Sequence, residues 1–376
     1  MRITVVAPEF PPDIGGVETY AFEYSKELVR RGHEVTVFTP PRARGHASLP
    51  GALVRPVLTQ CKNLDRQIFS DHPADVWHVM NAAYSWLASE VGPTIVSVHG
   101  NDFLRPYIPV ATYSVKRLPY LWRLGDLDSD WLKPYWFWRT RRLMALTLPR
   151  AKHIVANSQY TERALLNDFP DCRGNTSVAY VGVAERFFSI EHTLSRDGVA
   201  RLLTVCRLSE ARKNVDMVLR ALAKLKEKYL FTYTVVGDGH VRAHLERLTQ
   251  DLGLPDRVRF TGFVSQDNLL NAYSQADLFV LTSSILPGSH EGFGIAYLEA
   301  AASGVPSLAA RLAGAAEAVS EGVSGMFVEE PSVEAIALAL ATFFDRTTPF
   351  DRQACRRFAE QFSWRKVVDH VLKYYD

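Results

Sequence analysis

Two glutamates, Glu291 and Glu299, are spaced so that both carboxylates could act on one ligand. They belong to the stretch His290–Pro306, which reads HEGFGIAYLEAAASGVP. Carboxylates accept hydrogen bonds, so two of them on one wall of a cleft could bind the hydroxyl groups of a polyhydroxylated molecule. Glu299 stands among tyrosine, leucine and alanine, where an unpaired carboxylate would be costly. This apolar setting favours a paired, functional Glu299 over a solvated surface charge.

The turn between the two glutamates predicts a binding site for an anion. The apolar run Ala276–Leu281 predicts a buried strand, and a helix is expected to begin at Ile295, after Gly292 and Gly294. The first N–H groups of a helix have no partner within it, and they lie at the positive end of its dipole. A phosphate or a hydroxylated group suits such a terminus.

A second candidate pair is Arg207 and Lys213, in the loop RLSEARKN that follows the predicted strand Ala200–Cys206. A guanidinium binds phosphate oxygens in a bidentate way and an ammonium acts as a point charge, so the pair suits a diphosphate. Most such pairs are surface cations, but a position directly after a buried strand argues for ligand binding.

The first half of the chain offers Gly15, Gly16 and His99. The adjacent glycines follow the predicted strand Arg2–Ala7 and let the backbone approach a ligand, although a tight turn alone would explain them equally well. His99 follows the predicted strand Thr94–Val98, at the edge of a parallel sheet where ligands bind. A single histidine is more often structural. The glycines do not form the G-x-G-x-x-G pattern of a dinucleotide site.

Strand and helix patterns alternate in both halves of the chain, which predicts an α/β protein with two parallel-sheet domains. Strands are expected at 2–7, 33–38, 53–58, 75–80, 94–98, 152–156 and 175–183, and again at 200–206, 233–236, 258–264, 276–281, 305–309 and 325–328. Glu185–Gly198 lacks periodicity and is the predicted linker, and Phe362–Tyr375 is a predicted amphipathic helix. A chain of 376 residues exceeds a typical single core, which agrees with two domains.

The composition is that of an ordinary globular protein, with 47% hydrophobic and 22% charged residues. A net charge of +2 gives no global signal for binding nucleic acid, so no nucleic-acid partner is expected. The four cysteines are far apart and form no C-x-x-C pair, which predicts reduced thiols and a cytoplasmic location. No apolar run approaches the roughly 18 residues that a membrane helix needs.

Residues 103–152 combine tryptophan and tyrosine with ten Lys or Arg and three Asp. This mixture suits contact with an anionic inner-membrane surface, or a pocket for a lipid-linked acceptor. A helical pair with packed aromatic rings and solvated cations is the slightly preferred interpretation. The motif DLDSD at 126–130 resembles a metal-binding D-x-D, but no apolar strand precedes it, so a solvated loop is expected.

Taken together and in order, the motifs resemble those of the retaining glycosyltransferases of family 4. They are GGVE at 15–18, HG at 99–100, ANS at 156–158, RLSEARKN at 207–214, VVGDG at 235–239 and EGFGIAYLEAAASGVP at 291–306. The resemblance implies a GT-B fold, in which two Rossmann-like domains face a central cleft. Residues 1–185 would bind the acceptor, residues 186–361 would bind the nucleotide-sugar donor, and a helix in 362–376 would pack back on the N-terminal domain.

The resemblance also implies roles for single residues. Arg207 and Lys213 would hold the donor diphosphate and stabilise it as the leaving group. Glu291 would contact the donor sugar with His99 beside it, and Glu299 would bind the ribose hydroxyls. Further donor contacts would come from Gly15, Gly16, Phe263, Val264, Phe293, Gly294 and Ile295. No metal site and no cofactor are expected, because the two cations can meet the charge that develops on the leaving phosphate.

The expected function is transfer of a hexose of the mannose, rhamnose or glucose type, with retention of configuration, from GDP-mannose or a UDP-sugar. The acceptor would be a glycan or a lipid-linked glycan in the synthesis of a cell-surface polysaccharide such as lipopolysaccharide or exopolysaccharide. The enzyme would be cytoplasmic, or peripheral on the cytoplasmic face of the membrane. The alternatives are a nucleotide-sugar 2-epimerase, a non-catalytic nucleotide-sugar-binding protein and, least favoured, an NAD-dependent oxidoreductase.

Overall fold

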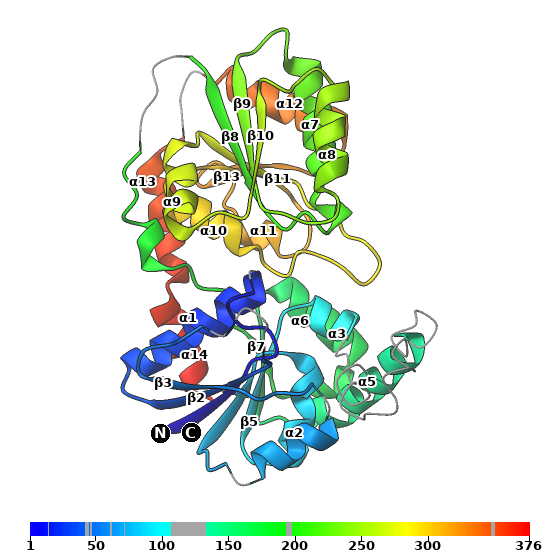
Figure 1. Ribbon diagram of the computed structural model, residues 1–376, viewed down its shortest axis with the longest axis vertical. Coiled ribbons are helices and arrows are strands. Elements are labelled where there is room, and N and C mark those ends of the chain that lie inside the picture. The colour runs from blue at the N-terminus through cyan, green and yellow to red at the C-terminus, as the bar shows by residue number, and fades with distance from the viewer. Residues whose placement is uncertain are drawn as a thin grey trace. The chain divides into compact units, whose positions relative to one another are not determined.

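The computed structural model describes residues 1–13, 15–41, 45, 47–60, 62–70, 72–106, 133–192, 198–346 and 350–376. It divides into two compact units (Figure 1). Unit 1 comprises Met1–Val181 and Trp364–Asp376, and unit 2 comprises Gly182–Ser363. Much of the aromatic and basic segment 103–152, including DLDSD, lies outside the described residues.

Within the described residues, unit 1 holds a seven-stranded parallel sheet with the order β3-β2-β1-β4-β5-β6-β7. The strands are β1 (Arg2–Val6), β2 (Glu34–Thr39), β3 (Ala52–Pro56), β4 (Val76–Val79), β5 (Thr94–Val98), β6 (His153–Ala156) and β7 (Thr176–Val178). The helices are α1 (Gly16–Arg30), α2 (Lys62–Phe69), η1 (Ala82–Ser89), α3 (Asn101–Leu104), α5 (Lys133–Thr147), η3 (Leu148–Arg150), α6 (Gln159–Asp168), η4 (Pro170–Cys172) and α14 (Trp364–Leu372). The strand order reverses between β1 and β4, which is where doubly wound sheets bind ligands.

Helices cover both faces of this sheet (Figure 1). On one face, side chains from β1, β4 and β5 pack with α2, η1, α5 and α6 in one apolar cluster. On the other face, α1 packs against α14, where the rings of Tyr20 and Trp364 are 5.3 Å apart. The Tyr24 and Tyr375 hydroxyls are 3.1 Å apart and buried. The expectation that the last helix packs on the N-terminal domain is therefore confirmed.

Within the described residues, unit 2 holds a six-stranded parallel sheet with the order β10-β9-β8-β11-β12-β13. The strands are β8 (Ala200–Val205), β9 (Phe231–Val236), β10 (Val258–Gly262), β11 (Leu278–Leu281), β12 (Ser307–Ala310) and β13 (Gly325–Val328). The helices are η5 (Glu185–Phe187), η6 (Ala211–Lys213), α7 (Val215–Leu225), α8 (Arg242–Asp251), α9 (Gln266–Gln275), α10 (Ile295–Ala302), α11 (Ala315–Ala318), α12 (Val333–Phe344), α13 (Arg352–Ala359) and η7 (Glu360–Phe362).

Strand β11 shows how the two faces of this sheet are filled. Leu278 and Val280 point into the apolar cluster with α7, α8 and α12, because alternate side chains of a strand point to opposite faces. Phe279 points the other way and contacts the rings of Tyr273 on α9 and Tyr297 on α10. The strand is thus apolar on both faces, as its sequence predicts for a central parallel strand.

In the part of the chain that the structure describes, no helix is both long enough and apolar enough to cross a membrane.

Candidate functional site

The loops that follow β8 and β11 meet at the carboxyl edge of the unit 2 sheet. These strands are neighbours although β9 and β10 separate them in sequence, so the strand order reverses between them. Asn214 joins the loops, since its side-chain amide donates to the carbonyl of Thr282 at 2.6 Å and to the hydroxyl of Ser284 at 2.7 Å. The loop that carries Arg207 and Lys213 is thereby held against the strand that leads to Glu291.

The glycines of VVGDG let a third loop approach the same edge. A Cβ on Gly237 would lie 1.9 Å from the carbonyl oxygen of Cys206, and one on Gly239 would lie 2.3 Å from the backbone of Leu208. Their φ angles of +129° and +156° are also unfavourable for other residues. The loop after β9 therefore packs directly on the loop that carries Arg207.

Glu291 lies at the centre of this edge as a largely buried, ion-paired carboxylate, with 13% of its side chain exposed. Its Oε2 is 2.6 Å from Nζ of Lys213 and 3.2 Å from a guanidinium nitrogen of Arg212. It also accepts a hydrogen bond from the Ser283 hydroxyl at 3.2 Å. Burial alone would raise its pKa, but Lys213 and Arg212 outweigh burial and lower the pKa to about 2. Glu291 is therefore a fixed anion.

The sequence interpretation missed Arg212, which is the anchor of this cluster. Its side chain is only 5% exposed and contacts Glu210 at 2.6 Å as well as Glu291. The guanidinium also donates to the hydroxyl of Ser289 at 3.0 Å. In RLSEARKN the sequence offers three cations, and nothing in the pattern distinguishes a buried arginine from the exposed ones.

Arg207 lies beside the cluster but is only loosely held. Its side chain is 50% exposed, and its guanidinium is 3.6 Å from the carboxylate of Glu210. The cluster contains three cations, Arg207, Arg212 and Lys213, and two carboxylates, Glu210 and Glu291, so its net charge is +1. This +1 is the charge of the exposed Arg207, because Arg212 and Lys213 balance Glu210 and Glu291, and an exposed cation of this kind is suited to an anionic ligand.

Helix α10 begins beside Glu291 as the sequence predicts. Gly294 is its N-cap, with φ of +94°, and no side chain caps this terminus. A Cβ on Gly294 would lie 2.4 Å from the ring of Tyr297. Phe293 is buried and packs on Phe362, so the phenyl ring is a core group, and only its backbone can meet a ligand.

Glu299 and Phe263 lie in contrasting surroundings. Glu299 on α10 is buried and accepts a hydrogen bond from the Tyr273 hydroxyl at 3.0 Å, which agrees with a paired carboxylate. Phe263 follows β10, and its side chain is 57% exposed, with the half-buried Val264 next to it. Ile295 is the first residue of α10. The donor contacts of these residues remain predictions.

Gly15, Gly16 and His99 belong to unit 1, and the contacts described for them lie within that unit. The glycines precede and begin α1, and Tyr20 on this helix contacts the His99 ring with a centroid distance of 4.8 Å. The backbone N–H of His99 donates to Asp102 at 2.9 Å. Burial lowers the pKa of His99, and the nearby Asp102 opposes this shift in part. Their predicted contacts with the donor remain predictions.

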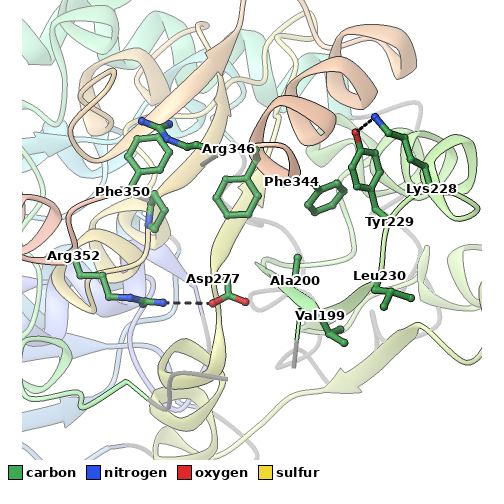
Figure 2. Close-up of a pocket in the computed structure, with 13 residues that line it drawn as sticks. Val199, Ala200, Lys228, Tyr229, Leu230, Asp277, Phe344, Arg346, Phe350 and Arg352 are labelled. Carbon is green, nitrogen blue, oxygen red and sulfur yellow. Dashed lines mark hydrogen bonds and ion pairs between the residues drawn. The ribbon is translucent and has the colours of Figure 1, made fainter. Parts of the chain in front are cut away.

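A separate pocket of about 540 Å³ lies at the amino-terminal edge of the unit 2 sheet (Figure 2). Arg352 reaches Asp277 across it at 3.4 Å, and Lys228 donates to the Tyr229 hydroxyl at 2.5 Å. The side chain of Arg346 lies over the ring of Phe350. None of the predicted site residues lines this pocket, because the predicted residues follow the strands and these residues precede them.

Two family models match the chain. Residues 14–186 match the model described as Glycosyltransferase Family 4, and residues 186–362 match Glycosyl transferases group 1. Among the described residues, no group of three or more His, Cys, Asp or Glu could hold a metal ion.

Two similar proteins come from Mycolicibacterium smegmatis. The GDP-mannose-dependent alpha-(1-6)-phosphatidylinositol monomannoside mannosyltransferase of Mycolicibacterium smegmatis is 29% identical over 89% of this chain and 87% of its own length. The D-inositol 3-phosphate glycosyltransferase of the same organism is 27% identical over 96% of this chain and 86% of its own.

Solved structures share the fold. The HepE protein of Anabaena in complex with UDP-glucose has a TM-score of 0.73 and 20% identity, with 99% of this chain and 98% of that chain covered. The sucrose-phosphate synthase of Thermosynechococcus elongatus has a TM-score of 0.75 and 18% identity, with 100% and 98% covered. Three observations agree: the order of the motifs, the reversal of strand order within each parallel sheet and the matched family models. This chain therefore belongs to the group 1 glycosyltransferases of the family 4 type, with a GT-B fold.

Proposed function

We propose that the protein is a retaining hexosyltransferase that uses a nucleoside-diphosphate sugar as donor. The observation that carries this proposal is the cluster of Lys213, Arg212 and Glu291 at the strand reversal of unit 2, with the exposed Arg207 beside it. The relatives support a hexose donor, because one is named GDP-mannose-dependent and the fold neighbour HepE was solved with UDP-glucose. These names support a mannose or glucose type of sugar and leave both bases open, and we keep rhamnose as a further candidate sugar.

The proposed chemistry follows from charge. When the sugar leaves the donor, negative charge develops on the β-phosphate, and preorganised cations stabilise this change. Lys213 is 12% exposed and oriented by Glu291, while Arg207 is exposed and can close on the ligand. Removing one such group typically costs about 2.7–4 kcal/mol of transition-state stabilisation. We therefore expect the reaction to proceed without a divalent metal, and the leaving phosphate to act as the base on the same face of the sugar.

The acceptor is proposed to be a glycan, free or linked to a lipid, in the synthesis of a cell-surface polysaccharide. Helix α5 supports a lipid-linked acceptor. Its exposed residues include Tyr135, Trp138, Arg142 and Leu146, which recur at helical spacing and so form one outward stripe. The sequence of α5 contains no acidic residue, and Arg142 lies over the Trp138 ring at 5.6 Å. Aromatic and cationic side chains on one helix face suit an anionic membrane surface, here proposed to be the cytoplasmic face.

The transfer reaction can be tested with defined donors. The protein would be incubated with GDP-mannose, UDP-glucose or UDP-N-acetylglucosamine and octyl α-D-mannopyranoside, with and without EDTA, while nucleoside diphosphate release is followed. We expect one donor to be consumed equally in both conditions, and NMR to show an α-linked product from an α-linked donor. A β-linked product, or activity that EDTA abolishes, would refute the retaining or the metal-independent part of the proposal.

The membrane surface is tested by co-sedimentation with vesicles of phosphatidylcholine that contain phosphatidylglycerol. We expect Trp138→Ser together with Arg142→Ser to reduce the bound fraction severalfold. Leu338→Ser is the matched control, because Leu338 is 71% exposed on α12 of unit 2. Equal binding of both variants and the wild type would exclude α5 as the membrane-contacting surface.

A further inference from the structure

The carboxyl edge of the unit 1 sheet carries three buried polar atoms for which the described residues supply no hydrogen-bond partner. They are Oε2 of Glu18, Nε2 of His99 and Oδ1 of Asn157. Glu18 and Asn157 are each only 6% exposed. A buried polar atom without a partner costs free energy and is rare in folded proteins, so a group of them calls for an explanation. A ligand that supplies the missing hydrogen bonds is one such explanation.

Two of these residues lie side by side. Strands β5 and β6 are parallel neighbours, and their register pairs Val98 with Ala156. The next residues along each strand are His99 and Asn157, and the N–H of Asn157 donates to the carbonyl of Val98 at 3.3 Å. His99 is held in place by Asp102 and is partly exposed, so this end of the edge is accessible from the surface.

The third residue, Glu18, lies in the first turn of α1, which follows β1 in the same sheet. A Cβ on Gly15 would lie 2.3 Å from Oε2 of Glu18. Gly15 has an extended backbone, with φ of 174°, that any residue could adopt, so the carboxylate rather than the backbone requires glycine there. The GGVE motif therefore leaves space for a buried carboxylate.

We propose that Asn157 and Glu18, with His99, bind hydroxyl groups of the sugar acceptor. The chemistry of the three groups matches hydroxyls. A carboxylate accepts hydrogen bonds and an amide both donates and accepts them, while a neutral imidazole donates from one nitrogen and accepts at the other. A hydroxyl both donates and accepts, so a polyol can satisfy all three, whereas the Glu18 carboxylate disfavours an anionic group next to it. This inference rests on the proposed transfer reaction and gives a role to Glu18 in the GGVE motif and to Asn157 in the ANS motif.

The test compares Asn157→Ala and Glu18→Ala with matched surface variants, Gln159→Ala and Glu34→Ala, whose parent residues are exposed in the same unit. Three quantities are measured: the dissociation constant of UDP and GDP, the apparent KM for octyl α-D-mannopyranoside with the accepted donor, and the melting temperature. We expect each site variant to raise this KM about fivefold or more, because a change of this size corresponds to the loss of about one hydrogen bond. Nucleotide affinity should stay within about twofold of the wild type.

The melting temperature separates a ligand-binding role from a structural one. In these two side chains, only Oε2 of Glu18 and Oδ1 of Asn157 are buried without a partner among the described residues, so a variant that keeps the melting temperature of the wild type and raises the KM assigns the side chain to ligand binding rather than to the fold. An unchanged KM, or no turnover that depends on octyl mannoside while nucleotide still binds, would overturn the inference. If the wild type binds neither UDP nor GDP, the proposed transfer reaction itself fails, which is a distinguishable result.

Discussion

The carboxyl edges of the two parallel sheets differ in how their polar groups are partnered. At the carboxyl edge of the unit 2 sheet, Glu291 is ion-paired with Lys213 and Arg212, and Arg212 is paired again with Glu210. At the carboxyl edge of the unit 1 sheet, the described residues leave polar atoms of His99 and Asn157 without hydrogen-bond partners. The first edge is thus built around ion pairs, although Oγ1 of Thr282 there also lacks a hydrogen-bond partner among the described residues, and the second edge carries polar atoms that are left without partners.

This difference separates two ways of preparing a binding site. Charged groups must be held by other charges, because an unpaired buried charge is far more costly than an unpaired neutral group. An edge that awaits a diphosphate therefore keeps its cations oriented by carboxylates. An edge that awaits hydroxyls can leave the neutral polar atoms of His99 and Asn157 open at a smaller cost, whereas the open oxygen of the Glu18 carboxylate at the same edge costs more.

The largest expected effect is on catalysis by Lys213→Ala. The ammonium is proposed to stabilise the leaving diphosphate, so its removal should lower kcat/KM by about 10²–10³-fold. Arg212 would still pair with Glu291, so the fold should be retained. Initial rates of nucleoside diphosphate release measure the effect, and Lys224→Ala on the exposed face of α7 is the control. A loss of less than about fivefold would remove Lys213 from the mechanism.

A second prediction concerns Glu291→Gln and acid. A carboxylate whose pKa falls from 4.5 to about 2 on folding contributes stability above pH 4.5 that is lost as the pH falls towards 2. That contribution is about 3 kcal/mol. The variant should therefore be less stable than the wild type at pH 7, and the gap should narrow by about this amount on acidification. Urea unfolding across this pH range measures it, and a gap that does not change with pH would contradict the ion-pair account.

Two glycine substitutions compare the backbone requirements of the two edges, because Gly294 precedes α10 in unit 2 and Gly15 precedes α1 in unit 1. Gly294→Ala forces a side chain onto a φ of +94° and against the Tyr297 ring, so we expect a loss of about 1–3 kcal/mol in the free energy of unfolding. Gly15→Ala meets only the end of the Glu18 side chain and should cost less than about 1 kcal/mol. Chemical unfolding of both variants gives the two values. Equal losses would show that Gly15 is also required by the backbone.

The smallest expected effect on stability is that of Arg207→Ala. Its ion pair with Glu210 is half exposed and 3.6 Å long, so its loss should change the free energy of unfolding by less than about 0.5 kcal/mol. Its proposed contact with the diphosphate should nevertheless weaken nucleotide binding. Unfolding and nucleotide titration of the same preparation would show whether the two effects separate, and a variant that is destabilised but binds normally would contradict this assignment.

The sequence predicted the strands and the motif-bearing turns because each has a local signal. Alternating strand and helix patterns predicted both parallel sheets, and Ser158 of the ANS motif is the N-cap of α6, since it accepts from the N–H of Thr161. The ion pair between Glu291 and Lys213 was not predicted, because it joins residues 78 positions apart through the neighbouring strands β8 and β11. The sequence also did not predict that buried atoms of Glu18 and Asn157 lack hydrogen-bond partners among the described residues, because burial depends on tertiary packing.

The central claim is that Lys213 at the charged edge of unit 2 binds the donor diphosphate, whereas Asn157 at the open edge of unit 1 does not. Calorimetric titration of UDP and GDP into the wild type, Lys213→Ala and Asn157→Ala tests it directly. The account predicts that one nucleotide binds the wild type and Asn157→Ala within about twofold and Lys213→Ala at least about tenfold more weakly. If Lys213→Ala binds like the wild type, or if both variants are weakened equally, the division of roles between the two edges is wrong.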